Sequence, residues 1–246
     1  METDLLILIL SFFVIALIYS SVGFGGGSSY LALLAIMGVH YEIIRPAALL
    51  CNIIVVTGGT YIFWKEGKLD LKKSWAFILA SMPCAFIGGF WRIDESVFFI
   101  LLGISLMLAS VFLWMNVMPL RKHPYDNKFL NGALGGGIGF LSGLVGIGGG
   151  IFLSPILNFL QWDDPKKISG LASLFILVNS ISGLAGQTSG NGNIEWSFIV
   201  PLLIAVFVGG QIGSRLGAKT FDPMYIKRIT AVVIFIAALF ILKDHV

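Results

Sequence analysis

Two stretches of the chain, SSVGFGGGSSY at residues 20–30 and SGLVGIGGGIF at residues 142–152, share the pattern Val-Gly-x-Gly-Gly-Gly. The pattern occurs once in each half of the 246 residues, and its valines, Val22 and Val145, lie 123 residues apart. Both stretches are strongly apolar, and three consecutive glycines disfavour a continuous helix. The sequence therefore predicts a duplicated chain in which each half contains a broken helical segment.

The composition is that of an integral membrane protein. Hydrophobic residues make up 57% of the chain, charged residues only 12%, and the mean hydropathy is +0.93, whereas about a quarter of the residues of soluble domains are charged. Runs of about 20 apolar residues can cross a bilayer as helices. The candidate spans are 46–64, 74–91, 96–120, 168–194, 196–214 and 223–242. Since these runs indicate helix rather than short alternating strands, we expect an all-α polytopic protein.

Two further features limit the possible functions. Glu2 and Asp4 stand where a signal peptide would carry basic residues, so the first apolar run is expected to remain in the mature chain. Cys51 and Cys84 both fall inside candidate spans, which favours buried thiols over a disulfide. The net charge of +3 is spread over short loops, which indicates orientation in the lipid bilayer and no nucleic-acid partner.

Two uncharged runs, residues 5–39 and 129–162, have an unusual length. Each is too long for one crossing and too short for two crossings and a turn. We expect a helix, an unwound glycine loop at membrane depth, and a short second helix. If the second run turns back, all of the 16 Lys and Arg except Arg45, Arg92 and Lys243 lie on one side, which is then cytoplasmic. The first run could be re-entrant by analogy or a broken full span.

This topology predicts two inverted repeats, residues 1–120 and 121–246. Each repeat would contain one glycine-broken segment and three transmembrane helices, and an odd number of crossings turns the second repeat upside down. Non-helical backbone is tolerated within a bilayer only where protein or a water-filled cavity surrounds it. We therefore expect the two glycine loops to meet at a cavity near the midplane.

The glycine loops are the candidate substrate-binding site. The short helix after each loop begins with free backbone N–H groups and the positive end of its dipole, which attract anions. These donors belong to Gly25, Gly26, Gly27, Ser28 and Ser29 in the first half and to Gly148, Gly149 and Gly150 in the second. The alternative is that glycines only let helices pack closely. We prefer that explanation for 135–139 and for Gly209, Gly213 and Gly217.

The polar residues within the spans favour an anion over a cation. All 13 Asp and Glu lie in predicted loops or at span ends, so no carboxylate is placed to bind a cation in the membrane. The neutral side chains of Asn52, Ser173 and Asn179 complete the predicted site, with Asn52 and Asn179 expected about six residues into the helices that follow the two glycine-broken segments. Arg45, Arg92 and Arg215 lie near span ends and are interpreted as interfacial anchors, with electrostatic attraction of anions toward the site as the alternative.

Enzyme chemistry has little support in the sequence. All three histidines lie outside the spans, no residues have metal-ligand spacing, and no serine lies in a nucleophile motif. The sequence therefore predicts no catalytic residue, no metal site and no cofactor.

The chain resembles the sulfite exporter TauE/SafE family of bacterial membrane transporters. The resemblance covers nearly the whole chain, and its motifs are 22–27, 145–150 with Ser154-Pro155, 173–180 and 209–217. Residues 47–52, Ala-Ala-Leu-Leu-Cys-Asn, depart from the small hydroxylated residues usual in the family. The resemblance implies transport of sulfite, sulfonates or related small organic anions across the bacterial inner membrane.

The resulting hypothesis is an anion transporter that works by alternating access around a midplane site. Its expected partners are a small anionic substrate and the lipid bilayer. Three alternatives stay open: a passive anion channel, a carboxylate uptake permease, and a membrane assembly partner without a substrate. The sequence also leaves open whether the chain forms a homo-oligomer.

Overall fold

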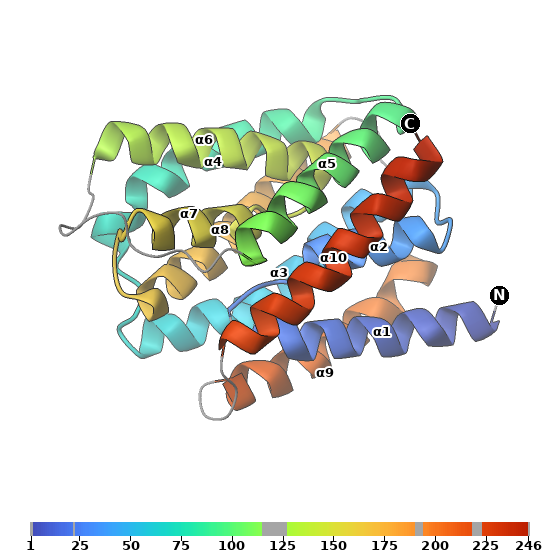
Figure 1. Ribbon diagram of the computed structural model, residues 1–246, viewed down its shortest axis with the longest axis horizontal. Coiled ribbons are helices and arrows are strands. Elements are labelled where there is room, and N and C mark those ends of the chain that lie inside the picture. The colour runs from blue at the N-terminus through green and yellow to red at the C-terminus, as the bar shows by residue number, and fades with distance from the viewer. Residues whose placement is uncertain (1, 22, 115–126, 190–193, 218–222, 246) are drawn as a thin grey trace.

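The computed structural model describes residues 2–21, 23–114, 127–189, 194–217 and 223–245 (Figure 1). Within these residues the chain is helical apart from short connections, which confirms an all-α fold. The helices are α1 (Glu2–Ser20), α2 (Gly27–Ile36), α3 (Tyr41–Lys65), α4 (Leu71–Phe90), α5 (Glu95–Trp114), α6 (Lys128–Val145), α7 (Gly150–Phe159), α8 (Pro165–Ser189), α9 (Trp196–Gly217) and α10 (Pro223–His245).

The two halves contain the same series of helices. In α1–α5 the lengths are 19, 10, 25, 20 and 20 residues, and in α6–α10 they are 18, 10, 25, 22 and 23 residues. In each half a glycine run separates the first helix from the short second one. The predicted boundary between the halves, at residues 120 and 121, lies outside the described residues.

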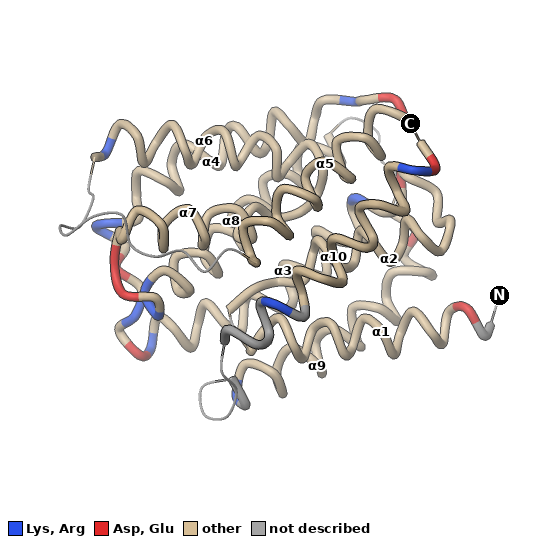
Figure 2. Tube along the Cα trace, viewed as in Figure 1, with Lys and Arg blue, Asp and Glu red and all other residues tan. Residues whose placement is uncertain are grey.

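Five of these helices are long and apolar enough to cross a membrane, namely α3, α4, α5, α8 and α9. The sixth predicted span corresponds to α10, whose first side chains lie outside those described. The end of the predicted span 96–120 also lies outside them, beyond Trp114. Large apolar side chains are exposed around the molecule, among them Leu79, Ile204 and Phe240. Because charged residues lie mostly at the helix ends (Figure 2), this apolar surface suits a multi-pass membrane protein.

Glycines let neighbouring helices approach closely. In α6, a Cβ on Gly135 would lie 2.5 Å from the carbonyl oxygen of Phe77 in α4, and one on Gly139 would meet the α4 backbone in the same way. Gly209 and Gly213 of α9 pack against the backbone of α1. The close-packing interpretation is confirmed for Gly135, Gly139, Gly209 and Gly213 but not for Gly137, where a Cβ would meet no atom within 4 Å. The surroundings of Gly217 lie outside those described.

The long helices α3 and α8 hold the same place in the two halves and run antiparallel. Thr60 in the last turns of α3 hydrogen-bonds Ser173, near the start of α8, with 3.0 Å between the hydroxyl oxygens. At the other end, a Cβ on Gly183 would lie 3.6 Å from Leu49. A parallel pair of helices could not make both contacts, so α3 and α8 point in opposite directions.

The short helices α2 and α7 fold back onto the helices that precede them. The Tyr30 ring in α2 stacks on Phe12 in the middle of α1, with 4.5 Å between ring centroids. At the start of α7, a Cβ on Gly149 would lie 3.0 Å from Ile138 in α6. Both ends of the chain lie at the same end of the molecule (Figure 1), as an even number of crossings requires.

Polar contacts hold the connection between α7 and α8 against α4. The Lys73 ammonium donates to Asp163 Oδ2 at 2.8 Å and to the Trp162 carbonyl oxygen at 2.9 Å. Trp162 itself is buried and meets Phe77 edge-on. Burial raises the pKa of Asp163, but hydrogen bonds from Lys73, the Asp164 N–H and Lys167 outweigh it and lower the pKa below its usual value.

Because the folded-state pKa of Asp163 is depressed, the pair stabilises the protein above the ordinary carboxyl pKa and loses this effect as the pH falls. Asp163→Asn should therefore lower the melting temperature by about 2 °C at pH 7, as expected for a partly exposed ion pair. The difference should vanish toward pH 3. Thermal unfolding in detergent measures it, with the exposed Glu66→Gln as control. An equal loss at both pH values would contradict the assignment.

Candidate functional site

The two glycine breaks adopt backbone conformations that favour glycine. Gly23 and Gly26 have φ of 83° and 88°, and Gly146, Gly148 and Gly149 have φ of 91°, 86° and 79°. Residues with a Cβ are strained in this left-handed region. Gly26 and Gly149 are the N-caps of α2 and α7. The backbone geometry of the breaks therefore requires glycine at these five positions of the repeated pattern.

Both breaks contact one buried amide, that of Asn52 in α3. Its Nδ2 donates to the carbonyl oxygen of Ile147 in the second break, at 3.1 Å. A Cβ on Gly25 or Gly27 in the first break would collide with the Asn52 side chain, and one on Gly148 would lie 2.7 Å from Nδ2. The structure thus brings the two glycine loops together, as expected from the sequence, with Asn52 between them.

The groups around this amide are neutral and partly unpaired. Neither α2 nor α7 has a side-chain hydrogen bond at its N-cap, so each begins with backbone N–H groups that no side chain caps. Asn52 Oδ1 and the buried Ser180 hydroxyl have no hydrogen-bond partner. The Ser180 oxygen would lie 3.2 Å from a Cβ on Gly148. Helix N-termini and hydroxyl donors of this kind suit a small oxyanion.

The serines of the predicted site are engaged in packing contacts. Ser29 shares a hydrogen bond of 2.5 Å with the Tyr19 hydroxyl in α1. Ser173 contacts Thr60 and donates to the Val56 carbonyl oxygen at 3.3 Å, so it joins α8 to α3. Ser28 is buried at the start of α2. The structure therefore places Ser28 beside the first break, whereas the Ser173 hydroxyl bonds α3 instead.

Asn52 and Asn179 lie deeper in their helices than the expected six residues, because they are the twelfth residue of α3 and the fifteenth of α8. Since α3 spans 41–65 and α8 spans 165–189, the residue equivalent to Asn52 is Ile176, which contacts Gly150 as Asn52 contacts Gly27. Asn179 lies three residues further along α8. Its Nδ2 donates to the Phe175 carbonyl oxygen of its own helix at 2.8 Å, and its Oδ1 has no partner.

Arg45 is not the interfacial anchor that the sequence predicted. The span was expected to begin at Pro46, but α3 begins at Tyr41, so Arg45 lies inside the helix and is only 8% exposed. Proline is tolerated in the first turn of a helix and so suggested the wrong start. Arg45 Nη2 donates to the Gly143 carbonyl oxygen of α6 at 3.3 Å.

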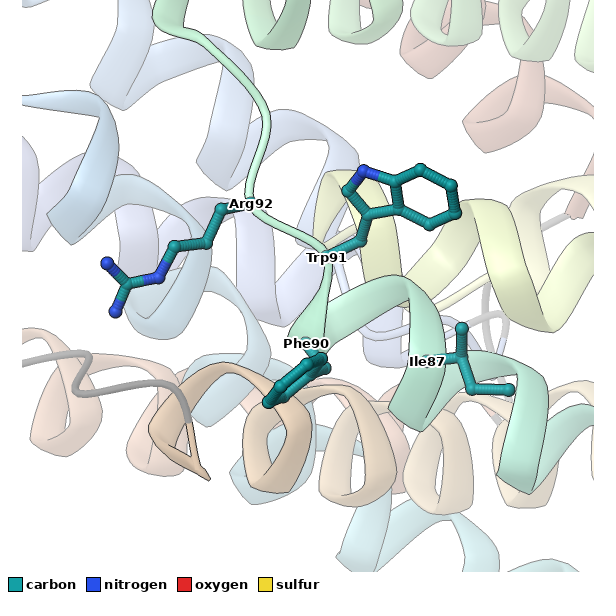
Figure 3. Close-up of a pocket in the computed structure, with 4 residues that line it drawn as sticks. All are labelled: Ile87, Phe90, Trp91 and Arg92. Atoms are coloured by element: carbon teal, nitrogen blue, oxygen red, sulfur yellow. The ribbon is translucent and has the colours of Figure 1, made fainter.

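A cavity of about 570 Å³ opens beside this arginine, between the start of α3 and the ends of α4 and α8. We call it the Arg45 cavity. Its polar lining consists mainly of His40, Glu42, Arg45, Arg92, Gln187 and Glu195. A second hollow, of about 430 Å³, is formed by Ile87, Phe90, Trp91 and Arg92 (Figure 3). Its aromatic side chains are exposed, so it belongs to the apolar surface of the protein.

In the part of the chain that the structure describes, no Asp or Glu is buried. The buried polar groups are Arg45 together with asparagine, serine and threonine side chains. A buried site without a carboxylate needs other ligands to neutralise the charge of a bare cation. The described interior therefore contains a positively charged side chain, Arg45, and no negatively charged one.

Broken helices around a buried polar site are the architecture of a membrane transporter. The chain matches the family model "Sulfite exporter TauE/SafE" over residues 8–241. It therefore belongs to this family and is a multi-pass membrane transporter rather than an enzyme; in bacteria such proteins lie in the inner membrane.

Its similarity to curated relatives extends over almost the full length. It is 32% identical to the "Probable membrane transporter protein y4hK" of Sinorhizobium fredii, over 97% of this chain and 98% of that protein. It is 24% identical to the "Probable membrane transporter protein YunE" of Bacillus subtilis, over 87% and 90% of the two chains. The protein YjnA of the same organism is 26% identical over 95% and 97%. No solved structure matches the chain.

Proposed function

We propose that the protein carries a small organosulfur oxyanion, such as sulfite or a sulfonate, across the membrane by alternating access. The observation that carries this proposal is the convergence of both glycine breaks on Asn52. Two helix N-termini and an amide provide neutral donors for an oxyanion. Neutral donors bind an anion less tightly than a charged side chain does, which suits a solute that must be released. The family name supports sulfite as the first substrate to test.

The arrangement of helices supports an inverted repeat, which provides two related conformations. The halves have matching helix lengths, and α3 and α8, which are equivalent, run antiparallel. In transporters of this type, one repeat rocks against the other around a fixed site near the midplane. We propose that residues 1–120 and 121–246 are these two repeats, with Asn52 at their contact.

The packing around Asn52 supports a carrier over a passive channel. Asn52, Ser180, and the glycines of both breaks are buried, while the Arg45 cavity opens at one end of the molecule. A carrier is closed on one side of its site when it is open on the other. Alternating access therefore predicts counterflow, in which unlabelled anion inside vesicles accelerates uptake of labelled anion.

Uptake of labelled sulfite and labelled methanesulfonate into proteoliposomes tests the proposal. We expect saturable uptake that sulfonates inhibit and acetate does not, with counterflow in preloaded vesicles. Asn52→Leu should lower kcat/KM about tenfold or more, because it removes the amide that both breaks contact.

The matched comparison is Asn179→Leu, the same substitution in α8, where the amide bonds to its own helix. This variant should transport much better than Asn52→Leu. Linear uptake without counterflow would instead indicate a channel. Preference for acetate would indicate a carboxylate permease, and no uptake of any anion would contradict the proposed function.

A further inference from the structure

We propose that the Arg45 cavity is a second binding site, where Arg45 captures the anionic group of the substrate before it reaches the glycine breaks. The inference deepens the proposed function and rests on it for the identity of the substrate. The volume of about 570 Å³ lies within the range of about 300–1,000 Å³ typical of small-molecule sites. A sulfonate or sulfite with some of its water fits such a space.

Arg45 is a buried charge with no counter-ion among the residues that the structure describes. It is 8% exposed, its Nε has no hydrogen-bond partner, and none of the ion pairs among the described residues includes it. Burying an unpaired charge costs several kcal/mol, so such groups are normally paired or serve a ligand. The planar guanidinium has five N–H donors in a fork that fits oxyanions. A bound anion would supply the missing partner.

The other charged residues of the cavity lie nearer to solvent. Glu42 and Glu195 are both exposed, so water hydrates their carboxylates, whereas Arg45 is buried. Arg92 also lines the cavity and is exposed. Figure 3 shows its side chain pointing away from Trp91 and Ile87. The only buried charge in the described lining is therefore positive, which favours an anion at that place.

A purely structural role would make Arg45 a cap for the last turn of α6, since cations stabilise helix C-termini. The hydrogen-bond geometry argues against capping as the whole role of Arg45. Its hydrogen bond to the Gly143 oxygen is long, 3.3 Å, and Gln187 Nε2 approaches the same oxygen at 3.5 Å. The carbonyl thus has a second donor, while the Arg45 Nε remains without a partner.

The cavity adjoins the second glycine break. A Cβ on Gly146 would lie 3.4 Å from the Arg45 Cα. In the other half, Gly23 makes the equivalent contact with Ser169 of α8. Ser169 is the residue of α8 that corresponds to Arg45 of α3. The second glycine break therefore lies next to a buried positive charge, and the first lies next to a hydroxyl group. By the positive-inside rule the arginine side is periplasmic, so capture should be stronger from that side.

Cysteine protection tests the capture site without requiring transport. Thr188 is exposed and lines the cavity. In a Cys84→Ala background, where Cys51 is buried, Thr188→Cys should react with iodoacetamide in detergent. Methanesulfonate should slow this reaction in a saturable manner. Arg45→Gln should raise the half-protecting concentration about tenfold, as loss of a charge-assisted hydrogen bond predicts, and Arg45→Lys should raise it less.

A second variant separates this site from the proposed transport site. Asn52→Leu should lose transport yet keep full protection of Thr188→Cys, because its side chain does not line the cavity. Protection without transport in the wild-type chain would refute the proposed function and leave the capture site standing. No protection, or equal protection with Arg45→Gln, would overturn the capture site. Comparison of melting temperatures excludes unfolding of the Arg45 variants.

Discussion

Gly27→Ala is expected to lower transport by about a hundredfold while the protein still folds and inserts. Gly27 is the first residue of α2, where alanine is a better helix former than glycine by about 1 kcal/mol. The added methyl group would collide with Asn52 Nδ2 and lie 2.7 Å from the Ile147 carbonyl oxygen. That oxygen is backbone of the other break, so the two breaks must separate. A misplacement of about 1 Å can cost about a hundredfold in rate. Uptake into proteoliposomes measures the loss.

Two alanine variants serve as controls for this effect. Gly150→Ala is the equivalent change in the second half, but its nearest neighbours are Cδ1 and Cγ1 of the Ile176 side chain, and the nearest backbone atom, the Ala172 oxygen, is 3.3 Å away. It should cost less, and Ile176→Ala should restore the rate. Gly137→Ala in α6 meets no atom within 4 Å and should transport normally. Gly27→Ala at the wild-type rate would show that contact between the breaks does not matter for transport.

The glycine breaks could be predicted from the sequence because their cause is local. Residues such as Gly26 and Gly149 adopt a left-handed backbone that glycine alone reaches without strain, and glycine runs inside apolar segments indicate this directly. The meeting of the breaks followed from a second general constraint. Unpaired backbone groups cannot face lipid, so both breaks had to lie inside the protein.

The side chains around the breaks could not be predicted, because they depend on register. The Val-Gly-x-Gly-Gly-Gly patterns lie 123 residues apart, but α3 and α8 lie 124 apart, since the connection before α8 is one residue longer relative to the pattern. The two asparagines of the predicted site, Asn52 and Asn179, are therefore not at equivalent positions, and Ile176 of α8 corresponds to Asn52 of α3. The burial of Arg45 was missed for a related reason, because the true start of α3 lies five residues before Pro46.

Gly139→Ala is expected to destabilise the protein without touching the proposed site. In α6, a Cβ on Gly139 would lie 2.6 Å from the Ser81 carbonyl oxygen and 2.8 Å from its Cα. Both atoms are backbone of α4, so no side-chain rotation relieves the contact and the helices must move apart. Overpacking of this kind costs about 1–3 kcal/mol, which corresponds to a melting temperature lower by about 3–10 °C for a chain of this size.

Gly137→Ala, two residues earlier on the same helix, is the matched control for this measurement. It makes the same chemical change where no atom lies within 4 Å, so the higher helix propensity of alanine should leave the melting temperature unchanged or slightly raised. Thermal unfolding of both variants in detergent separates helix propensity from helix contact. An equal response of the two variants would mean that α4 and α6 do not pack through Gly139. Because such contacts hold membrane helices together without a hydrophobic driving force, the difference should persist in lipid vesicles.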